Sequence, residues 1–382
     1  MDLTTLGMGI MLALAALGFD TVWHPTQVIL EASVARKFDK IAIDDAMVDG
    51  ILRSEVERVA ATPTLMGKPR IELGHQGGIG MALVTAAKLQ SVAYALQSEV
   101  GFRPDQIRVA LFSEGEVVKV LVTGTGTGSG SQRIAAFEQQ VELQKGETVV
   151  QLLHRAALVG MARIDPYLTA LSLMQRHASD QDFTDAEALI TVAKSRLPPT
   201  PLSRERSLFE NLQGILALFR GNRQDAHTWF RLAIASSPDN TAAVLNLAFA
   251  ELQLGRFREA ADRMELLLSE TPSTDKTLLG TGYVTWGAAL LGLRDTNGAD
   301  GLLAKAIAVN PSSAVAWDIW SEVKRAKGEP ARADRLRQQA LSVADGFENY
   351  AEVAALYFRL AWRDEQPVVR SQFVNLPTPA QH

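Results

Sequence analysis

The chain has 382 residues, enough for more than one domain, and 47% of them are hydrophobic, which is ordinary for a protein with a buried core. It carries a formal net charge of −5 and contains no cysteine. The mild negative charge gives no general electrostatic footprint for nucleic acid, and the lack of cysteine excludes disulfides, thiolate zinc sites and cysteine nucleophiles.

An uncharged apolar run extends from Leu3 to Phe19, and Trp23 follows it. A run of about 17 residues is at the short end of what crosses a bilayer core, and tryptophan is common at the membrane interface. We interpret residues 1–23 as a transmembrane anchor, which predicts a single-pass protein of the cell (inner) membrane. A cleaved signal peptide and a buried core helix remain alternatives. The basic residues nearest the run do not decide on which side of the membrane the rest of the chain lies.

Residues 24–165 alternate between strand and helix patterns and end at Asp165-Pro166, where proline disfavours helix in the preceding residue. The patterns predict strands over 26–34, 68–73, 107–112, 116–123 and 132–143, and helices over 44–59, 81–98 and 147–163. The third and fourth of these strands read as a hairpin, so part of the sheet should be antiparallel. We therefore predict one small α+β domain, and we recognise no family for it.

A glycine-rich stretch, Gly74 to Gly80, joins a predicted strand to a predicted helix. Backbone amides at such a junction can hold phosphate. No Lys-Ser/Thr pair follows, and the glycine spacing is not that of a dinucleotide site. An enzyme or nucleotide-binding regulator that uses loop 74–80 is therefore our alternative hypothesis. The second glycine-rich stretch, 124–131, is better explained as a flexible hairpin loop.

The sequence contains no pattern typical of a catalytic or metal centre. Its six histidines share no metal-ligand spacing, and the carboxylates form no obvious pair in a cleft. We predict no catalytic residue, no metal site and no cofactor, and a protein that is not an enzyme.

A repeated pattern runs from about residue 167 to residue 347. Each of the first four copies has a small residue, a larger apolar residue four positions later and a proline twelve positions after the small residue, and the last copy keeps the small residues Ala333 and Ala340. One copy shows it in Ala260, Met264 and Pro272. Proline ends the second helix of each copy because it lacks the amide donor. The copies lie near residues 167–200, 207–240, 241–274, 280–313 and 314–347, with a period of about 34 residues.

This pattern resembles the tetratricopeptide repeat (TPR) superfamily. The resemblance implies an all-α TPR solenoid over residues 166–363, with a capping helix at 348–362 and a disordered tail at 364–382. The predicted fold is therefore an α+β N-terminal domain followed by an all-α TPR solenoid, with one N-terminal transmembrane helix. This layout resembles that of membrane-anchored TPR proteins of bacteria. It implies a scaffold that binds other proteins.

In the register of the repeat, eight residues of two first helices share an inner face: Leu208, Asn211, Ile215, Phe219, Leu245, Phe249, Leu252 and Gln253. We predict that they line a concave groove for an apolar or helical segment of a protein partner, with no role for nucleic acid. The alternative is that the first helices pack on each other or on the α+β domain. If the groove is functional, Phe249 should contribute to binding more than to stability.

Overall fold

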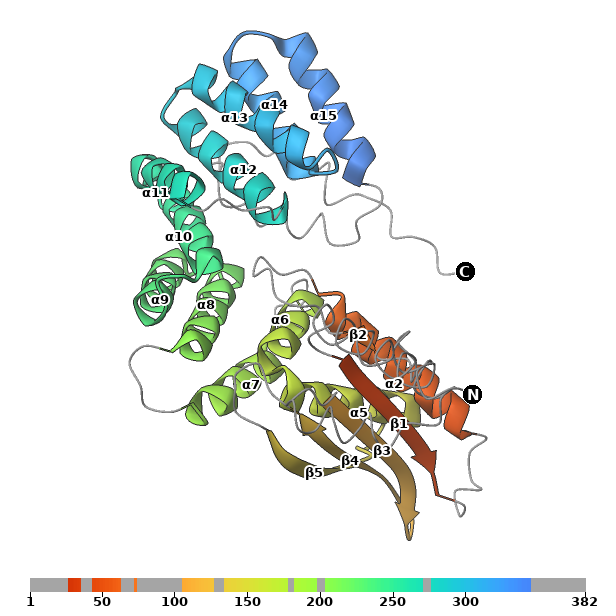
Figure 1. Ribbon diagram of the computed structural model, residues 1–382. Helices are drawn as coiled ribbons and strands as arrows, with labels where there is room; N and C mark the ends of the chain where they lie inside the picture. The colour runs from red at the N-terminus through yellow and green to blue at the C-terminus, as the bar shows by residue number, and fades with distance from the viewer. Residues whose placement is uncertain are drawn as a thin grey trace, which may run out of the picture. The chain divides into compact units, whose positions relative to one another are not determined.

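The computed structural model describes residues 27–35, 43–62, 72–73, 105–126, 134–177, 182–197, 203–270 and 276–344. The chain divides into two compact units. The first contains a β-sheet and the helices as far as α7, and the second contains α8 to α15 (Figure 1).

The first unit is built on a mixed sheet in which β1 lies between two parallel partners. Its strands are β1 (Gln27–Val34), β2 (Glu72–Leu73), β3 (Asp105–Glu114), β4 (Val117–Gly126) and β5 (Ile134–Glu142), in the order β2-β1-β3-β4-β5. β1 pairs in parallel with β2 and β3, whereas β3, β4 and β5 pair antiparallel. The β3–β4 hairpin turns at Gly115. Its φ is 64°, a value that glycine adopts freely because it has no Cβ.

Helices α2 (Asp45–Ala60) and α5 (Val149–Ile164) pack against the sheet and against each other. Alternate strand residues point to one face of a sheet, and here they supply the core residues Val28, Leu30, Ile107, Val109, Leu111, Val120, Val122 and Val141. Both helices begin at a side-chain cap. Asp44 accepts a hydrogen bond from the backbone of Met47, and Thr148 forms a capping box with Gln151.

The first unit confirms a small sheet with helices in the N-terminal region, including its antiparallel part. The predicted helix over 81–98, the glycine-rich loop 74–80 and the apolar run at 1–23 lie outside the described residues. Within the described ranges, no helix combines the length and the apolar character needed to cross a membrane. The anchor therefore stays a prediction.

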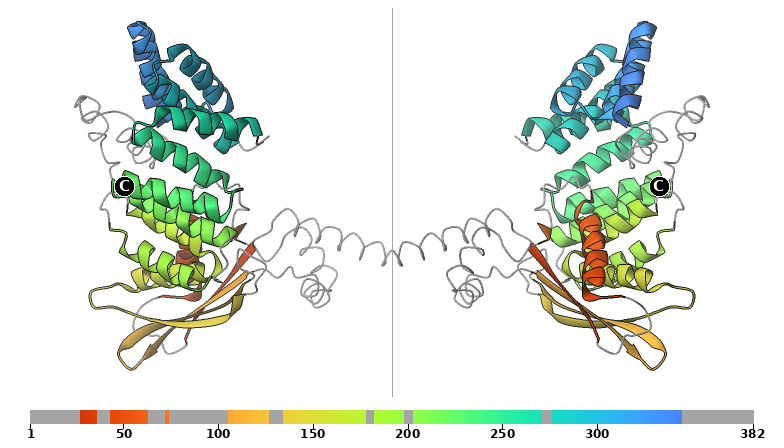
Figure 2. Two further views of the ribbon diagram at one scale, coloured as in Figure 1. Left: turned by 90° about the vertical axis from the view of Figure 1, so that its left-hand side faces the viewer. Right: turned by 90° about the vertical axis from the view of Figure 1, so that its right-hand side faces the viewer.

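The described part of the second unit contains eight helices in four consecutive pairs. They are α8 (Arg204–Phe219), α9 (Arg223–Ser236), α10 (Thr241–Gln253), α11 (Phe257–Glu270), α12 (Lys276–Gly292), α13 (Thr296–Val309), α14 (Ala314–Ala326) and α15 (Pro330–Ala344). Each helix contacts the next, and the first helices of successive pairs also contact one another (Figure 2). This arrangement confirms the predicted helical repeats.

The repeated small residues are the points of closest helix approach. Ala226, Ala260, Ala299 and Ala333 are fully buried in the second helices. In the first helix α8, a Cβ added to Gly214 would collide with the ring of Phe230. The apolar faces of neighbouring helices meet at these positions, as the period predicts.

The turn inside each repeat requires one left-handed residue. Gly221, Gly255 and Gly328 adopt φ between 73° and 77° at the ends of α8, α10 and α14. Arg294 takes the same place after α12 with a φ of 65°, although it has a Cβ. At Arg294, where the usual glycine is missing, the position in the fold therefore imposes the left-handed conformation.

The predicted first copy, 167–200, also contains two helices, α6 (Pro166–Arg176) and α7 (Thr184–Ser195). Contacts group α7 and most of α6 with the sheet, and Leu168 of α6 belongs to the core of the first unit. The domain boundary that we placed at residue 165 stays a prediction. The predicted capping helix 348–362 and the tail lie outside the described residues.

Candidate functional site

All eight residues of the predicted groove lie on α8 and α10, two first helices that contact each other. Two of them, Ile215 and Phe219, keep partial exposure. The Phe219 ring packs at 5.6 Å from the ring of Phe183. The other six are buried: Leu208, Asn211, Leu245, Phe249, Leu252 and Gln253.

The expected exposure of Phe249 is wrong. Its side chain is only 4% exposed and belongs to a core cluster with Leu247 and Met264. The cause is the number of neighbours, because α10 contacts α8, α9, α11 and α12. The sequence pattern assigns one inner face to such a helix and therefore underestimates how much of its surface neighbouring helices bury. Whether these residues bind a partner stays a prediction.

The face shared by α8 and α10 contains amide groups with unused hydrogen-bonding capacity. Asn211 Oδ1 accepts a hydrogen bond from Asn246 Nδ2 at 2.9 Å, which joins the two helices. In the described part of the chain, Asn211 Nδ2 and both amide atoms of the buried Gln253 have no hydrogen-bond partner. Leaving such a group buried and unpaired costs about 1–3 kcal/mol.

A buried ion pair joins α10 to α11. Arg263 donates two hydrogen bonds to the Glu251 carboxylate, at 3.0 and 2.6 Å. His227 of α9 lies 3.9 Å from the same carboxylate and accepts a hydrogen bond from Arg256 at 3.1 Å through Nε2. Desolvation, together with the charge of Arg256, lowers the pKa of His227. A neutral histidine whose lone pair is engaged in this way is a structural group and not a general base.

A second ion-pair group ties α13 to α14. Asp300 accepts hydrogen bonds from Trp320 at 2.6 Å, Lys324 at 2.7 Å and Lys327 at 3.0 Å. Burial alone would raise the pKa of Asp300, but these three donors together hold it well below its usual range. Asp300 is therefore a permanent anion that fixes the position of α14.

Asp318 of α14 is fully buried, and its carboxylate differs from that of Asp300 in having no hydrogen-bond donor within the described ranges. Its nearest cation is Arg337 of α15, whose Nε lies 3.6 Å away and whose NH1 is also 3.6 Å from Glu322. Burial raises the pKa of Asp318 to about 6, although the Arg337 charge opposes the shift. This carboxyl therefore changes its charge near neutral pH.

The polar contacts between α2 and α5 of the first unit have no catalytic geometry. His154 Nδ1 lies 2.9 Å from the carboxylate of the buried Glu55, which also pairs with Arg58 at 3.1 Å. None of the residues that the structure describes gathers into a metal-binding group of three or more suitable side chains. The pair joins the two helices.

Sequence reasoning did not identify Glu251 and Asp318 as buried carboxylates, or the half-buried Arg263 as the partner of Glu251. A weak signal was available, because Glu251 and Asp318 occur within otherwise apolar first-helix patterns. Only the structure shows which cation each of them meets.

Comparisons with known proteins agree with the repeat. A tetratricopeptide repeat family model matches residues 217–276. A crystal structure of MamA has 17% sequence identity and a TM-score of 0.34, with 45% of this chain and 94% of that chain covered. A second MamA crystal structure has 19% identity and a TM-score of 0.31, with 46% and 100% covered. No curated protein matches the chain.

The family match begins in the last turn of α8 and ends at the first residue of α12, so it covers α9, α10 and α11 in full. Its position agrees with the turn glycines Gly221 and Gly255 and with the buried Ala226 and Ala260. Residues 217–276 are thus a segment of the tetratricopeptide repeat superfamily.

Proposed function

We propose that this protein is a non-enzymatic scaffold that binds a protein partner through the first-helix face of α8 and α10. The observation that carries the proposal is the TPR match at residues 217–276, which includes the end of α8 and all of α10. The TPR segment supports a binding role over a catalytic one.

The partner segment that fits this face is apolar or helical. Ile215 and Phe219 keep exposed surface and are therefore the first side chains that a partner meets. Phe219 ends α8, and Gln253 ends α10 in the neighbouring repeat. Arg223, at the start of α9, donates to the backbone carbonyl of Gln253 at 3.4 Å, so these two helix ends lie at the same side of the array. An apolar side chain of the partner can contact Ile215 and Phe219 there.

A photo-crosslinking amino acid placed at Phe219 tests this site in cells that express the full chain. We expect one discrete adduct, which a second substitution, Ile215→Arg, strongly reduces because it puts a charge into the apolar contact. The matched control is the same crosslinker at Leu232, an exposed leucine on the second helix α9. If the two positions give the same adducts, or if Ile215→Arg leaves the adduct unchanged, the proposed face is wrong.

We propose further that residues 1–23 anchor the protein in the cell membrane as a single pass, with the apolar run Leu3 to Phe19 as support. The full-length protein should then sediment with membranes and resist carbonate extraction, whereas a chain that begins at His24 should be soluble. A soluble full-length protein with an intact N-terminus would contradict the anchor. A membrane-free mature protein that lacks the run would indicate a cleaved signal peptide.

A further inference from the structure

The outer edge of β5 is an open set of backbone hydrogen-bonding groups. Among the described strands, β5 is the last of the sheet and pairs with β4 alone (Figure 1). The amide of Leu143 donates to the carbonyl of Val118 at 2.9 Å, so Leu143 and every second residue before it face β4. The N–H and C=O groups of the intervening residues Glu138, Gln140 and Glu142 therefore point away from the sheet.

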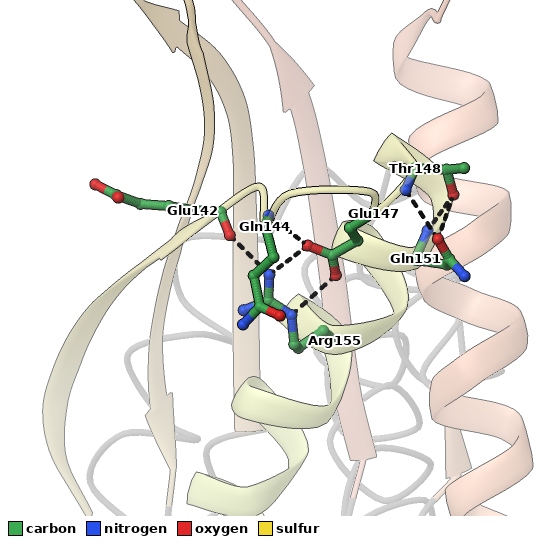
Figure 3. A network of polar contacts seen from close by, with 6 residues as sticks. All are labelled: Glu142, Gln144, Glu147, Thr148, Gln151 and Arg155. Carbon is green, nitrogen blue, oxygen red and sulfur yellow. Dashed lines mark hydrogen bonds and ion pairs between the residues drawn. The ribbon is translucent and has the colours of Figure 1, made fainter.

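One contact within the chain already uses this edge. Arg155 of α5 donates to the backbone carbonyl of Glu142 at 2.7 Å, and the Glu147 carboxylate holds the same guanidinium at 3.0 and 2.7 Å (Figure 3). This bond confirms the outward direction of the Glu142 carbonyl and closes that end of the edge. Glu138 and Gln140 are exposed, and within the described ranges their outward N–H and C=O groups have no hydrogen-bond partner.

The edge also carries a negative charge that is not neutralised. The side chains of Glu138, Gln140 and Glu142 project from the face opposite the core, because their neighbours Phe137 and Val141 belong to it. Lys119 lies 2.9 Å from Glu142 and 2.8 Å from Glu114. Glu138 has no such cation within the described residues, so a basic group beside it would be favoured.

We propose that the β5 edge binds an extended segment of another protein, which adds a strand to the sheet and places a lysine or arginine opposite Glu138. Strand addition takes its affinity from main-chain hydrogen bonds and its specificity from alternate side chains. On the core side, the added strand would extend the surface of Phe137 and Val141. A partner that alternates basic or polar residues with apolar ones therefore fits both faces.

A second copy of this chain fits the edge poorly. Antiparallel pairing of two β5 strands about Gln140 would place Glu138 of each copy opposite Glu142 of the other, and pairing about Glu138 would oppose two Glu138 side chains. Like charges directly opposite each other destabilise a strand pair. Charge complementarity thus selects a basic segment over self-association, and the proposal does not depend on the TPR face.

The test uses the full chain and two fluorescent peptides, one that alternates lysine with valine and one that alternates glutamate with valine. We expect saturable binding of the lysine peptide in an anisotropy titration and much weaker binding of the glutamate peptide. Glu138→Lys should weaken binding of the lysine peptide by roughly threefold to tenfold and strengthen binding of the glutamate peptide. The reason is that the charge pair between residue 138 and the peptide changes sign.

Two matched variants of Gln140 test whether the outward backbone N–H of this residue takes part in binding. Gln140→Pro removes an outward N–H without removing a bond to β4, and edge positions of this kind tolerate proline. It should abolish binding of the lysine peptide, while Gln140→Ala, which keeps the N–H, should bind like the unmodified protein. Equal binding by the proline and alanine variants would overturn the proposal. Should the proline variant unfold, an unchanged peptide preference in Glu138→Lys would overturn it instead.

Discussion

Phe249→Ala should lower the free energy of unfolding of the helical unit by about 3–5 kcal/mol, the usual range for truncating a buried phenylalanine. The Phe249 side chain is almost completely buried beside Leu247 and Met264. The substitution removes apolar contacts and leaves a cavity that the surrounding helices fill only in part. The loss should reach the whole repeat, because successive helices depend on one another for burial.

Denaturant unfolding followed by helix content measures this loss. Phe219→Ala is the matched control, since Phe219 ends α8 with partial exposure and packs mainly on the Phe183 ring. The control should cost clearly less stability than Phe249→Ala. Equal and small losses in both variants would show that Phe249 is not a core residue.

Local signals were sufficient to predict the helical repeats. Gly255 ends α10, Pro272 follows α11, and Ala260 is buried where two helices approach. Each of these signals acts within a few residues of its own position in the chain. The turn at Arg294 was less evident, because there the packing of neighbouring helices imposes a left-handed conformation that the side chain does not favour.

Long-range contacts explain what the sequence did not show. The pairing of Glu31 with Arg108 in the parallel strands β1 and β3 joins residues 77 positions apart, and no local pattern encodes it. In the same way, Phe249 was assigned to an open groove because the sequence does not show how many helices surround α10. The face of α8 and α10 could be predicted as a set, but not the burial of its members. The β5 edge depends on strand order, which also required the structure.

Asp318 leads to a pH-dependent prediction. Burial raises the pKa of this carboxyl from 3.8 to about 6, so the folded protein binds its proton more tightly than the unfolded chain does. The associated stability is fully present below about pH 3.8 and is lost as the pH rises to about 6. Asp318→Asn keeps the shape of the side chain but cannot ionise, so it removes this pH dependence.

The stability of Asp318→Asn relative to the unmodified protein should therefore improve by roughly 1–3 kcal/mol between pH 4 and pH 7. Denaturant unfolding at several pH values measures this difference, and the change with pH is more informative than its value at one pH.

Asp334→Asn is the control, because Asp334 is exposed and contacts Arg325 at 3.3 Å at the solvent end of the same α14–α15 charge network. Its difference from the unmodified protein should stay flat, since exposed ion pairs contribute little. A flat difference for Asp318→Asn as well would mean that Arg337, 3.6 Å away, compensates the buried charge fully. In that case the last repeat would not respond to pH through Asp318.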